Sequence, residues 1–413
     1  MKMKNIIKKQ QKTIFIGFMS VALFIICICT VCTAYAADKD NAKTPVDIPG
    51  LTYDHSMELS YAEEFSVDYY NDGYALITID QEGQFLVVPE GKKAPEGLDP
   101  DIAVLQQPIN NIYLEKDITV IQQPLNNIYL VATSAMDLFR AIDGIDSIRL
   151  SGTQENGWYI QEAKDAMESG KMIYAGKYNA PDYELILDEG CGLAIESTMI
   201  HHNPEVEEKL EQFGIPVMVE RSSYESHPLG RTEWMKLYAV LLGKEDVAEK
   251  AFKEQTDKLD KVLTSDDKDT GKTVAFFYIN STGAVNVRKN GDYVSNMIEL
   301  AGGKYVPEDT GESDNALSTM NMQMEEFYAK AKDADYIIYN STIDGELSSI
   351  DELLAKSNLL ADFKAVKDGN VWCTGKNLFQ ETTELGTMIE DIHTILTTDD
   401  DSLDELVYMH KLK

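Results

Sequence analysis

Cysteine is scarce in this chain of 413 residues, and its five cysteines are unevenly placed. Cys27, Cys29 and Cys32 fall within the first 36 residues, which leaves Cys191 and Cys373 for the rest. Two cysteines cannot form a disulfide scaffold, and a chain of this length has ample material for ordinary hydrophobic cores. We therefore expect two buried free thiols.

Basic residues are also few, with 37 Lys and Arg against 70 Asp and Glu. The first 36 residues hold five lysines and no acid, so the remainder has 37 − 5 = 32 basic side chains and a formal charge of 32 − 70 = −38. Nucleic-acid binding needs a basic footprint for the phosphates, so no nucleic-acid partner is expected. The acidity indicates a solvated exterior.

The motifs of common enzymes are missing. Gly190-Cys191-Gly192 lacks the third glycine of a dinucleotide-binding loop, and Asp266 stands where a phosphate loop ending in Gly271-Lys272-Thr273 needs glycine. Neither H-E-x-x-H nor G-x-S-x-G occurs. These absences argue against an enzyme, and no built-in cofactor is expected.

Long hydrophobic runs are confined to the N-terminus. Five lysines precede an apolar run from Ile14 to Val31, which Ala34-Tyr35-Ala36 follows. The pattern predicts that residues 1–36 are a signal peptide or, since about 20 apolar residues span a bilayer, an N-terminal membrane anchor. A lipid on Cys32 is disfavoured, because Cys29-Thr30-Val31 lacks the small residue and leucine of a lipoprotein cleavage site. We expect an extracytoplasmic protein, periplasmic or at the cell surface.

The remaining chain divides into a linker (37–64), a first lobe (65–230), a connecting helix (231–264) and a second lobe (272–413). Phe65–Asp80 and Gln84–Pro89 alternate like one hairpin closed at 81–83. Residues 101–116 (DIAVLQQPINNIYLEK) are nearly repeated by 117–132 (DITVIQQPLNNIYLVA). Two copies are too few for a solenoid, so we expect a duplicated strand whose first copy forms an edge or flap.

Beyond residue 128, short apolar strands alternate with amphipathic helices in both lobes, which is typical of parallel α/β architecture. Residues 231–263 contain no proline and one glycine, Gly243, and predict one long helix or two nearly continuous ones. The expected fold is therefore α/β, with two Rossmann-like lobes, central parallel-rich sheets and a long helix joining them. Small ligands bind at the carboxyl ends of such strands, in the cleft between the lobes.

A family resemblance follows from the order of several segments. "NNIYLVATSAMDLFRAI", "SIRLSG", "GKYNAPDYELIL", "LAIES", "IPVMVE", the long helix, "MQMEEFYAKAKDADYIIYN" and "VWCTG" resemble the substrate-binding proteins of ABC importers for iron-siderophores, haem and cobalamin. The resemblance covers roughly 65–396. It implies a monomeric binding protein that hands its ligand to a permease powered by an ATPase.

The resemblance also implies that a surface glutamate of each lobe docks onto arginines of the permease. The matching residues are Glu184 in the first lobe and Glu325 in the second. Two extra residues follow Glu325 before the "DADYIIY" strand, so Glu326 is an alternative. Carboxylate and guanidinium form a bidentate pair, which suits such docking.

The cleft is expected where scarce ligand-type residues gather. Loops after the strands 193–196 and 217–220 hold three of the six histidines and two of the five arginines. The candidate ligand-binding residues are Met199, His201, Arg221, Tyr224 and Arg231 from the first lobe, and Arg288, Tyr293 and Trp372 from the second.

Arginines with aromatic walls favour an anionic ferric siderophore. Haem would need an axial ligand such as Met199, His201, His202 or Tyr224, and cobalamin stays open. A free zinc or manganese receptor built on His201, His202 and His227 is the alternative, and an extracellular enzyme is a more distant one. Ordinary ion pairs of Arg221 with Glu220 or Glu225, and of Arg231 with Glu233, would account for the arginines without a ligand.

Overall fold

The computed structural model describes residues 45–98, 118–308, 310, 319–398, 400 and 402–413. The predicted signal or anchor and the first copy of the 16-residue repeat lie outside the described residues. Residues 48–413 form one compact unit, separate from 1–47. No helix among the described residues is both long and apolar enough to cross a membrane.

The chain begins with a five-stranded sheet in the order β1-β2-β3-β4-β5. Its neighbours are antiparallel except β4 and β5, which are parallel. The bounds are β1 Tyr53–Ser56, β2 Phe65–Tyr70, β3 Ala75–Ile79, β4 Gly83–Val88 and β5 Ile118–Gln122. The predicted hairpin closed at 81–83 is present as β3 and β4. The prediction that 65–80 forms one arm was wrong: the chain reverses at Asn71–Gly73, where Asp72 and Gly73 take positive φ, and so makes an extra strand.

The second copy of the repeat forms two strands in different sheets. Its first half is β5 of the N-terminal sheet, and its second half is β6 (Ile128–Leu130) of the first lobe. Pro124 lies between them, and proline cannot donate to a strand ladder. The repeat therefore joins two sheets.

The first lobe is an all-parallel sheet in the order β12-β11-β6-β7-β8. One face packs on α3 and α8 through Ile128, Leu130 and Ile195, and the other packs on α5 and α6 through Tyr129 and Ala194. Burial of both faces explains its apolar strands. The strands after β6 are β7 Ile148–Ser151, β8 Ile173–Tyr174, β11 Leu193–Ser197 and β12 Val217–Glu220. The helices are α3 Ala135–Ala141, α4 Gln161–Glu168, α5 Tyr183–Asp188 and α6 Pro204–Gln212. Between α4 and α5, β9 Gly176–Lys177 and β10 Ala180–Pro181 form a small hairpin.

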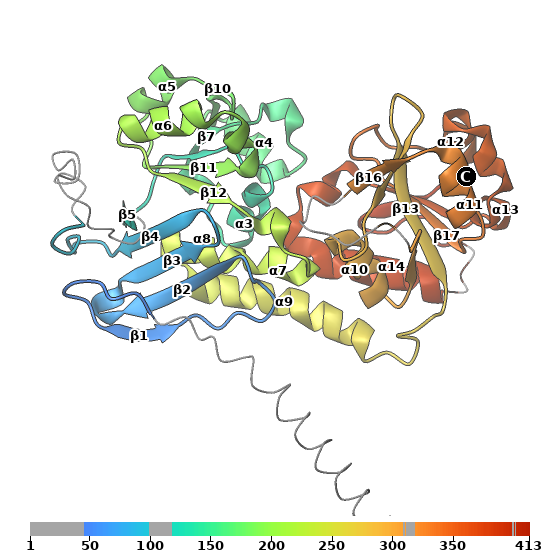
Figure 1. The fold of residues 1–413 in the computed structure, drawn as a ribbon, viewed down its shortest axis with the longest axis horizontal. Helices are drawn as coiled ribbons and strands as arrows, with labels where there is room; N and C mark the ends of the chain where they lie inside the picture. The colour runs from blue at the N-terminus through green and yellow to red at the C-terminus, as the bar shows by residue number, and fades with distance from the viewer. Residues whose placement is uncertain (1–44, 99–117, 309, 311–318, 399, 401) are drawn as a thin grey trace, which may run out of the picture. The chain divides into compact units, whose positions relative to one another are not determined.

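The second lobe contains a seven-stranded mixed sheet in the order β16-β14-β13-β17-β18-β19, and β15 also pairs with β13. Strand β13 runs parallel to β15 and β17, and β17 runs parallel to β18, whereas β14, β16 and β19 are antiparallel to their neighbours. The strands are β13 Thr273–Ile279, β14 Val285–Arg288, β15 Lys304–Val306, β16 Thr319–Met322, β17 Tyr336–Tyr339, β18 Val371–Thr374 and β19 Met409–Lys411. The helices are α10 Tyr293–Leu300, α11 Met324–Ala331, α12 Ile350–Lys356, α13 Lys364–Asp368 and α14 Leu385–Thr397. These parallel-rich sheets confirm the predicted fold class (Figure 1).

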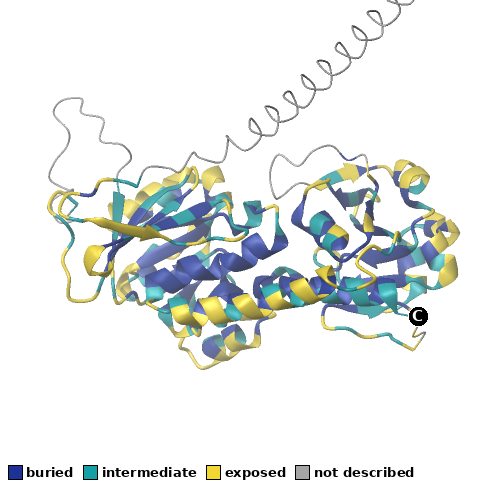
Figure 2. Cartoon of the chain, turned by 90° about the horizontal axis from the view of Figure 1, so that it is seen from below, coloured by how far each residue is buried: buried dark blue, intermediate teal, exposed yellow. Residues whose placement is uncertain are grey.

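The connection between the lobes consists of three helices: α7 Pro228–Glu233, α8 Met235–Leu242 and α9 Glu245–Leu263. Gly243 separates α8 from α9 because it takes the left-handed conformation, with φ of 65°. Buried and exposed residues alternate along α9 at helical spacing (Figure 2). Gln255 and Lys258 of α9 donate to Glu384 at the start of α14.

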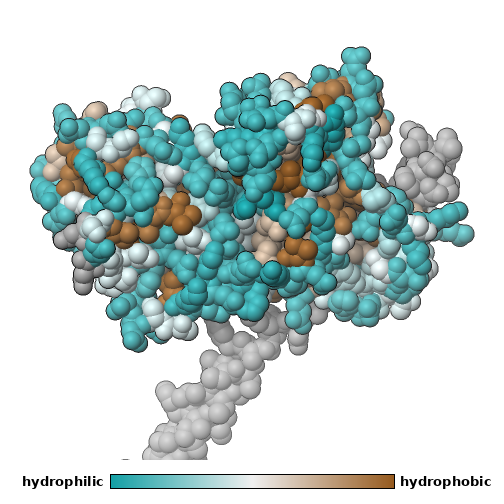
Figure 3. Space-filling model, turned by 180° about the vertical axis from the view of Figure 1, so that it is seen from behind, coloured by the Kyte–Doolittle hydropathy of each residue, from teal (hydrophilic) through white to brown (hydrophobic). Residues whose placement is uncertain are grey.

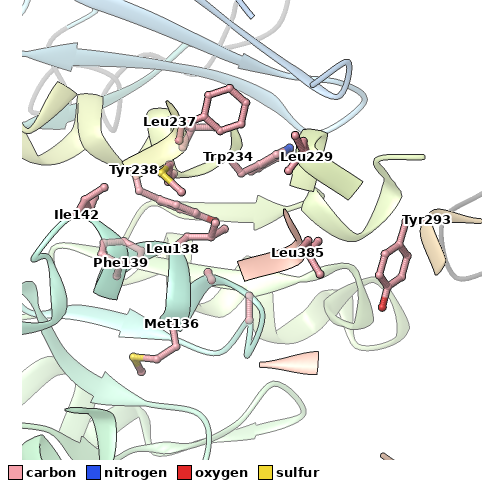
Figure 4. Close-up of a cluster of buried hydrophobic side chains, with 14 of the residues drawn as sticks. Met136, Leu138, Phe139, Ile142, Leu229, Trp234, Leu237, Tyr238, Tyr293 and Leu385 are labelled. Atoms are coloured by element: carbon pink, nitrogen blue, oxygen red, sulfur yellow. The ribbon is translucent and has the colours of Figure 1, made fainter. Parts of the chain in front are cut away.

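A second contact joins the lobes away from these helices. The buried Asp137 of α3 accepts hydrogen bonds from the backbone N–H (2.8 Å) and the hydroxyl (2.6 Å) of Thr383. Gln380 donates to the carbonyl of Gly157 (2.8 Å) and accepts from the N–H of Tyr159 (2.7 Å). One hydrophobic core runs through both lobes and the connecting helices, and Figure 4 shows its central side chains.

Candidate ligand-binding site

An arginine of the connecting helices and an arginine of the second lobe meet at one tyrosine ring. Arg231 lies in α7, Arg288 ends β14, and Tyr293 is the first residue of α10. The Cζ atoms of Arg231 and Arg288 lie 4.0 and 5.5 Å from the centroid of the Tyr293 ring. Tyr293 lies at one end of the core cluster drawn in Figure 4. The structure thus brings together three of the residues predicted to line the cleft.

Positive charge is in excess at this junction. Arg231 and Arg288 are only 6% and 8% exposed, and both guanidiniums stay charged. The carboxylate in contact is that of Asp292, whose Oδ2 lies 3.4 Å from Nη1 of Arg288 and whose Oδ1 caps α10. Burial raises the pKa of Asp292, although Arg288 and Arg231 act to lower it. An added anion would compensate the second guanidinium.

Arg231 has free hydrogen-bonding capacity. Its Nη1 donates to the carbonyl of Ser223 at 3.3 Å, while its Nε has no hydrogen-bond partner among the described residues. A buried donor without a partner costs about 1–3 kcal/mol. Nearby, Asn296 of α10 donates to the carbonyl of Ser226 (2.9 Å), so the second lobe reaches the same loop. A ligand with acceptor oxygens would satisfy the Arg231 donor.

Arg221 forms ion pairs with two acidic residues that the sequence did not predict as its partners. Its Nε donates to Glu64 (2.8 Å) and its Nη1 to Glu82 (3.2 Å), and it stacks on Tyr224 with Cζ 4.3 Å from the ring centroid. Neither Glu220 nor Glu225, the partners suggested by the sequence, makes this ion pair. Glu82 also contacts Nε2 of His201 at 3.2 Å. Arg221 is therefore neutralised by the N-terminal sheet and its leading segment.

The other predicted cleft residues have different surroundings. Met199 is 41% exposed, and the His201 side chain is 47% exposed, both in the turn after β11. Trp372 is buried in β18 and belongs to the core. In the described part of the chain, no three His, Cys, Asp or Glu side chains are grouped closely enough to hold a metal ion.

Two buried glutamates of the cleft loop hold the preceding segment 57–64, which we call the strap. Glu233 accepts the backbone N–H groups of Ser60, Tyr61 and Ala62 at 2.8–3.1 Å. Glu225 accepts those of Glu63 and Glu64 at 2.9–3.1 Å, and Nε1 of Trp234 at 2.9 Å. The strap thereby fixes the loop that carries Arg221 and Arg231.

Glu196 of β11 is a buried acid outside this junction. Both its carboxylate oxygens lack hydrogen-bond partners among the described residues. Burial, together with the nearby Glu207, raises the pKa of Glu196 to about 8. Glu196 is therefore mainly protonated at neutral pH.

The predicted docking glutamates lie on exposed helix surfaces. Glu184 is in the first turn of α5, whose N-cap Asp182 accepts from the N–H of Leu185 (3.1 Å). Glu325 and Glu326 are in the first turn of α11, and Glu326 pairs with Lys330 at 3.0 Å. All three are exposed to solvent.

A family model described as periplasmic binding protein matches residues 132–378. Two uncharacterized lipoproteins of Methanocaldococcus jannaschii are similar to this chain. One is 24% identical, over 92% of this chain and 92% of its own length. The other is 23% identical, over 93% of this chain and 97% of its own length.

Solved structures show a similar fold. The periplasmic heme-binding protein HutB of Vibrio cholerae superposes with a TM-score of 0.55 at 16% identity, over 66% of this chain and 99% of its own. A periplasmic heme-binding protein of Pseudomonas aeruginosa gives 0.52 at 16% identity, over 70% and 98%. The periplasmic catecholate-siderophore-binding protein of Vibrio cholerae gives 0.51 at 12% identity, over 66% and 94%. At these identities the likeness establishes the fold, including the two lobes.

Proposed function

The chain belongs to the periplasmic binding protein family, and we propose that it captures an anionic metal chelate outside the cytoplasm and delivers it to an ABC permease. The family consists of solute-binding proteins, and the proposed role requires no chemistry on the ligand. One observation favours an anionic ligand: Arg231 and Arg288 meet at Tyr293, and in the described structure only Arg288 has an ion pair, with Asp292.

A ferric siderophore is the first choice of ligand. Catecholate or carboxylate oxygens would accept charge-assisted hydrogen bonds from the two guanidiniums, including Nε of Arg231. The Tyr293 ring adds an aromatic wall between them. Arg221 contributes less, since Glu64 and Glu82 already neutralise it. The similar structures include two heme-binding proteins and a catecholate-siderophore-binding protein, which supports this range of ligands.

Haem and cobalamin belong in the same ligand screen. Propionates would take the place of catecholates at the arginines, and the exposed Met199 and His201 are available as axial ligands. Hemin bound in this way should show an absorption spectrum that Met199→Ala or His201→Ala alters.

The proposal is tested by fluorescence titration of the intact exported protein with four probes: a ferric tris-catecholate, a neutral ferric trihydroxamate, hemin and cyanocobalamin. Arg231→Gln and Arg288→Gln should each weaken binding of the anionic chelate tenfold or more, about 1.4 kcal/mol. The matched control is Arg149→Gln, which removes the surface ion pair with Glu189 and should leave affinity unchanged. Equal affinity in all variants, or a preference for the neutral chelate, would contradict an anionic ligand.

Membrane attachment and permease docking complete the proposal. The N-terminal segment would hold the protein at the outer surface of the membrane, either by its apolar run or, as the name lipoprotein of its relatives suggests, by a lipid. Glu184 and Glu325 would contact the permease, one from each lobe.

A further inference from the structure

A pocket lies away from the Arg231–Tyr293–Arg288 junction, between the N-terminal sheet and the helices α8 and α9. It is partly open to solvent and has a volume of about 440 Å³, in the range of small-ligand sites. Its walls include His55 of β1, Tyr69 of β2, Lys236 of α8, and Glu245 and Glu249 of α9. The family model matches residues 132–378, so the sheet side of this pocket lies outside the matched residues.

The one ammonium group in the described pocket wall, that of Lys236, already forms ion pairs with acids of this chain. Nζ of Lys236 lies 3.1 Å from both Glu233 and Glu249, and it stands 4.7 Å from the ring centroid of Phe252. It also reaches the carbonyl of Glu58 at 3.4 Å. Lys236 is only 5% exposed, so its ammonium group is hardly accessible to an added anion.

The remaining charge in the pocket wall is negative. Glu58, Glu245 and Glu249 line it, and only Glu249 shares Lys236. Glu245 forms no ion pair among the described residues, and burial raises the pKa of its carboxyl. An added cation would therefore be favoured over an added anion.

An aromatic pair forms the opposite side. The rings of His55 and Tyr69 stack with centroids 4.7 Å apart and an interplanar angle of 19°. Tyr69 lines the same pocket as Glu245 and Glu249, and burial, with these two carboxylates, raises the pKa of Tyr69 to about 12. Its hydroxyl makes no hydrogen bond within the part of the chain that the structure describes. An aromatic face beside carboxylates suits an organic ammonium ion, which gains from both.

We propose that this pocket binds a small organic ammonium ion, with its charged nitrogen between Glu245 and the Tyr69 hydroxyl and its carbon chain along the His55–Tyr69 stack. The site is independent of the cleft, since none of its residues contacts Arg231, Arg288 or Tyr293 in the described structure. It would make the protein responsive to a second solute.

The test uses putrescine as the probe and 1,4-butanediol, a neutral molecule of the same length, as its control. Isothermal titration of the exported chain should show putrescine binding and no heat with the diol. Glu245→Gln and Tyr69→Leu should each weaken putrescine binding at least tenfold. Glu254→Gln, which removes an exposed acid of the same helix outside the pocket, should not change it.

A localised signal separates this site from general attraction to an acidic protein. In ¹H–¹⁵N spectra of the imidazoles, the His55 resonance should shift with putrescine and that of His393 should not. Three results would overturn the proposal: no putrescine binding at millimolar concentration, equal loss in Glu254→Gln and Glu245→Gln, or an unmoved His55 resonance. Arg231→Gln should leave putrescine affinity unchanged, so the cleft and the pocket are tested separately.

Discussion

At the scale of single residues, the chain's few arginines divide into two kinds. Arg221 is compensated by Glu64 and Glu82 from distant segments. Arg288 has an ion pair with Asp292, whereas Arg231 has no ion pair within the described structure and its Nε has no hydrogen-bond partner there. The number of arginines near a cleft is thus a poor guide to ligand binding. What matters is the carboxylate partners that folding brings to each.

Glu196 predicts a pH-dependent stability. The pKa rises from an ordinary 4.5 to about 8 on folding, so the folded chain binds one more proton between these values. The contribution of Glu196 to the free energy of unfolding should be largest below pH 4.5. It should fall as the pH rises toward 8, by up to about 1.4 kcal/mol for each pH unit. Glu196→Gln, which stays neutral, should match the parent near pH 4.5 and exceed it at pH 8.

Urea unfolding at several pH values measures this difference. Glu208→Gln on the exposed face of α6 is the control and should retain the slope of the parent protein. A Glu196→Gln protein with the same pH slope as the parent would contradict the assignment of a neutral buried carboxyl. Glu207, whose pKa burial also raises, contributes in the same direction.

At the scale of elements, the strap lies outside the residues that the family model matches. Glu233 binds three backbone N–H groups of the strap and the ammonium of Lys236 while fully buried. Glu233→Gln should destabilise the protein by about 3 kcal/mol, because a buried ion pair loses one partner. Urea unfolding measures the loss, and hydrogen exchange should show faster exchange of the amides at 60–62.

The matched control for the strap is Glu249→Gln. Glu249 is the other carboxylate on Lys236, but its side chain is 61% exposed, and its loss should cost less than about 1 kcal/mol. Similar destabilisation by both substitutions would show that Lys236, and not the strap, is what Glu233 stabilises.

Local signals explain which elements could be predicted from the sequence. Leu193–Ser197, Pro204–Gln212 and Val217–Glu220 agree with the sequence within about a residue, because apolar runs, a proline at the helix start and periodicity are all local. Strands β8 and β15 have two and three residues and form only by pairing with distant strands. Partners of Arg221 lie 157 and 139 residues away, so no local pattern revealed them.

At the scale of the whole molecule, one large hydrophobic core runs through both lobes and their connections, and each lobe holds a further separate cluster. Figure 3 shows hydrophobic patches scattered over a mostly hydrophilic face. Glu184 of α5 and Glu325 of α11 are each an exposed acid at a helix start, in different lobes. Under the proposed function, they give the permease one charged contact on each lobe.

The last prediction concerns transport in cells that carry the protein's own permease. Glu184→Arg combined with Glu325→Arg should abolish most uptake, because guanidinium against permease arginines is repulsive. Ligand affinity of the purified variant should stay unchanged, since neither residue contacts the Arg231–Tyr293–Arg288 junction in the described structure. Glu211→Arg on exposed α6 is the control for charge alone. Replacing Glu326 instead of Glu325 tests the register in the second lobe, and full uptake by the double variant would contradict docking through these two acids.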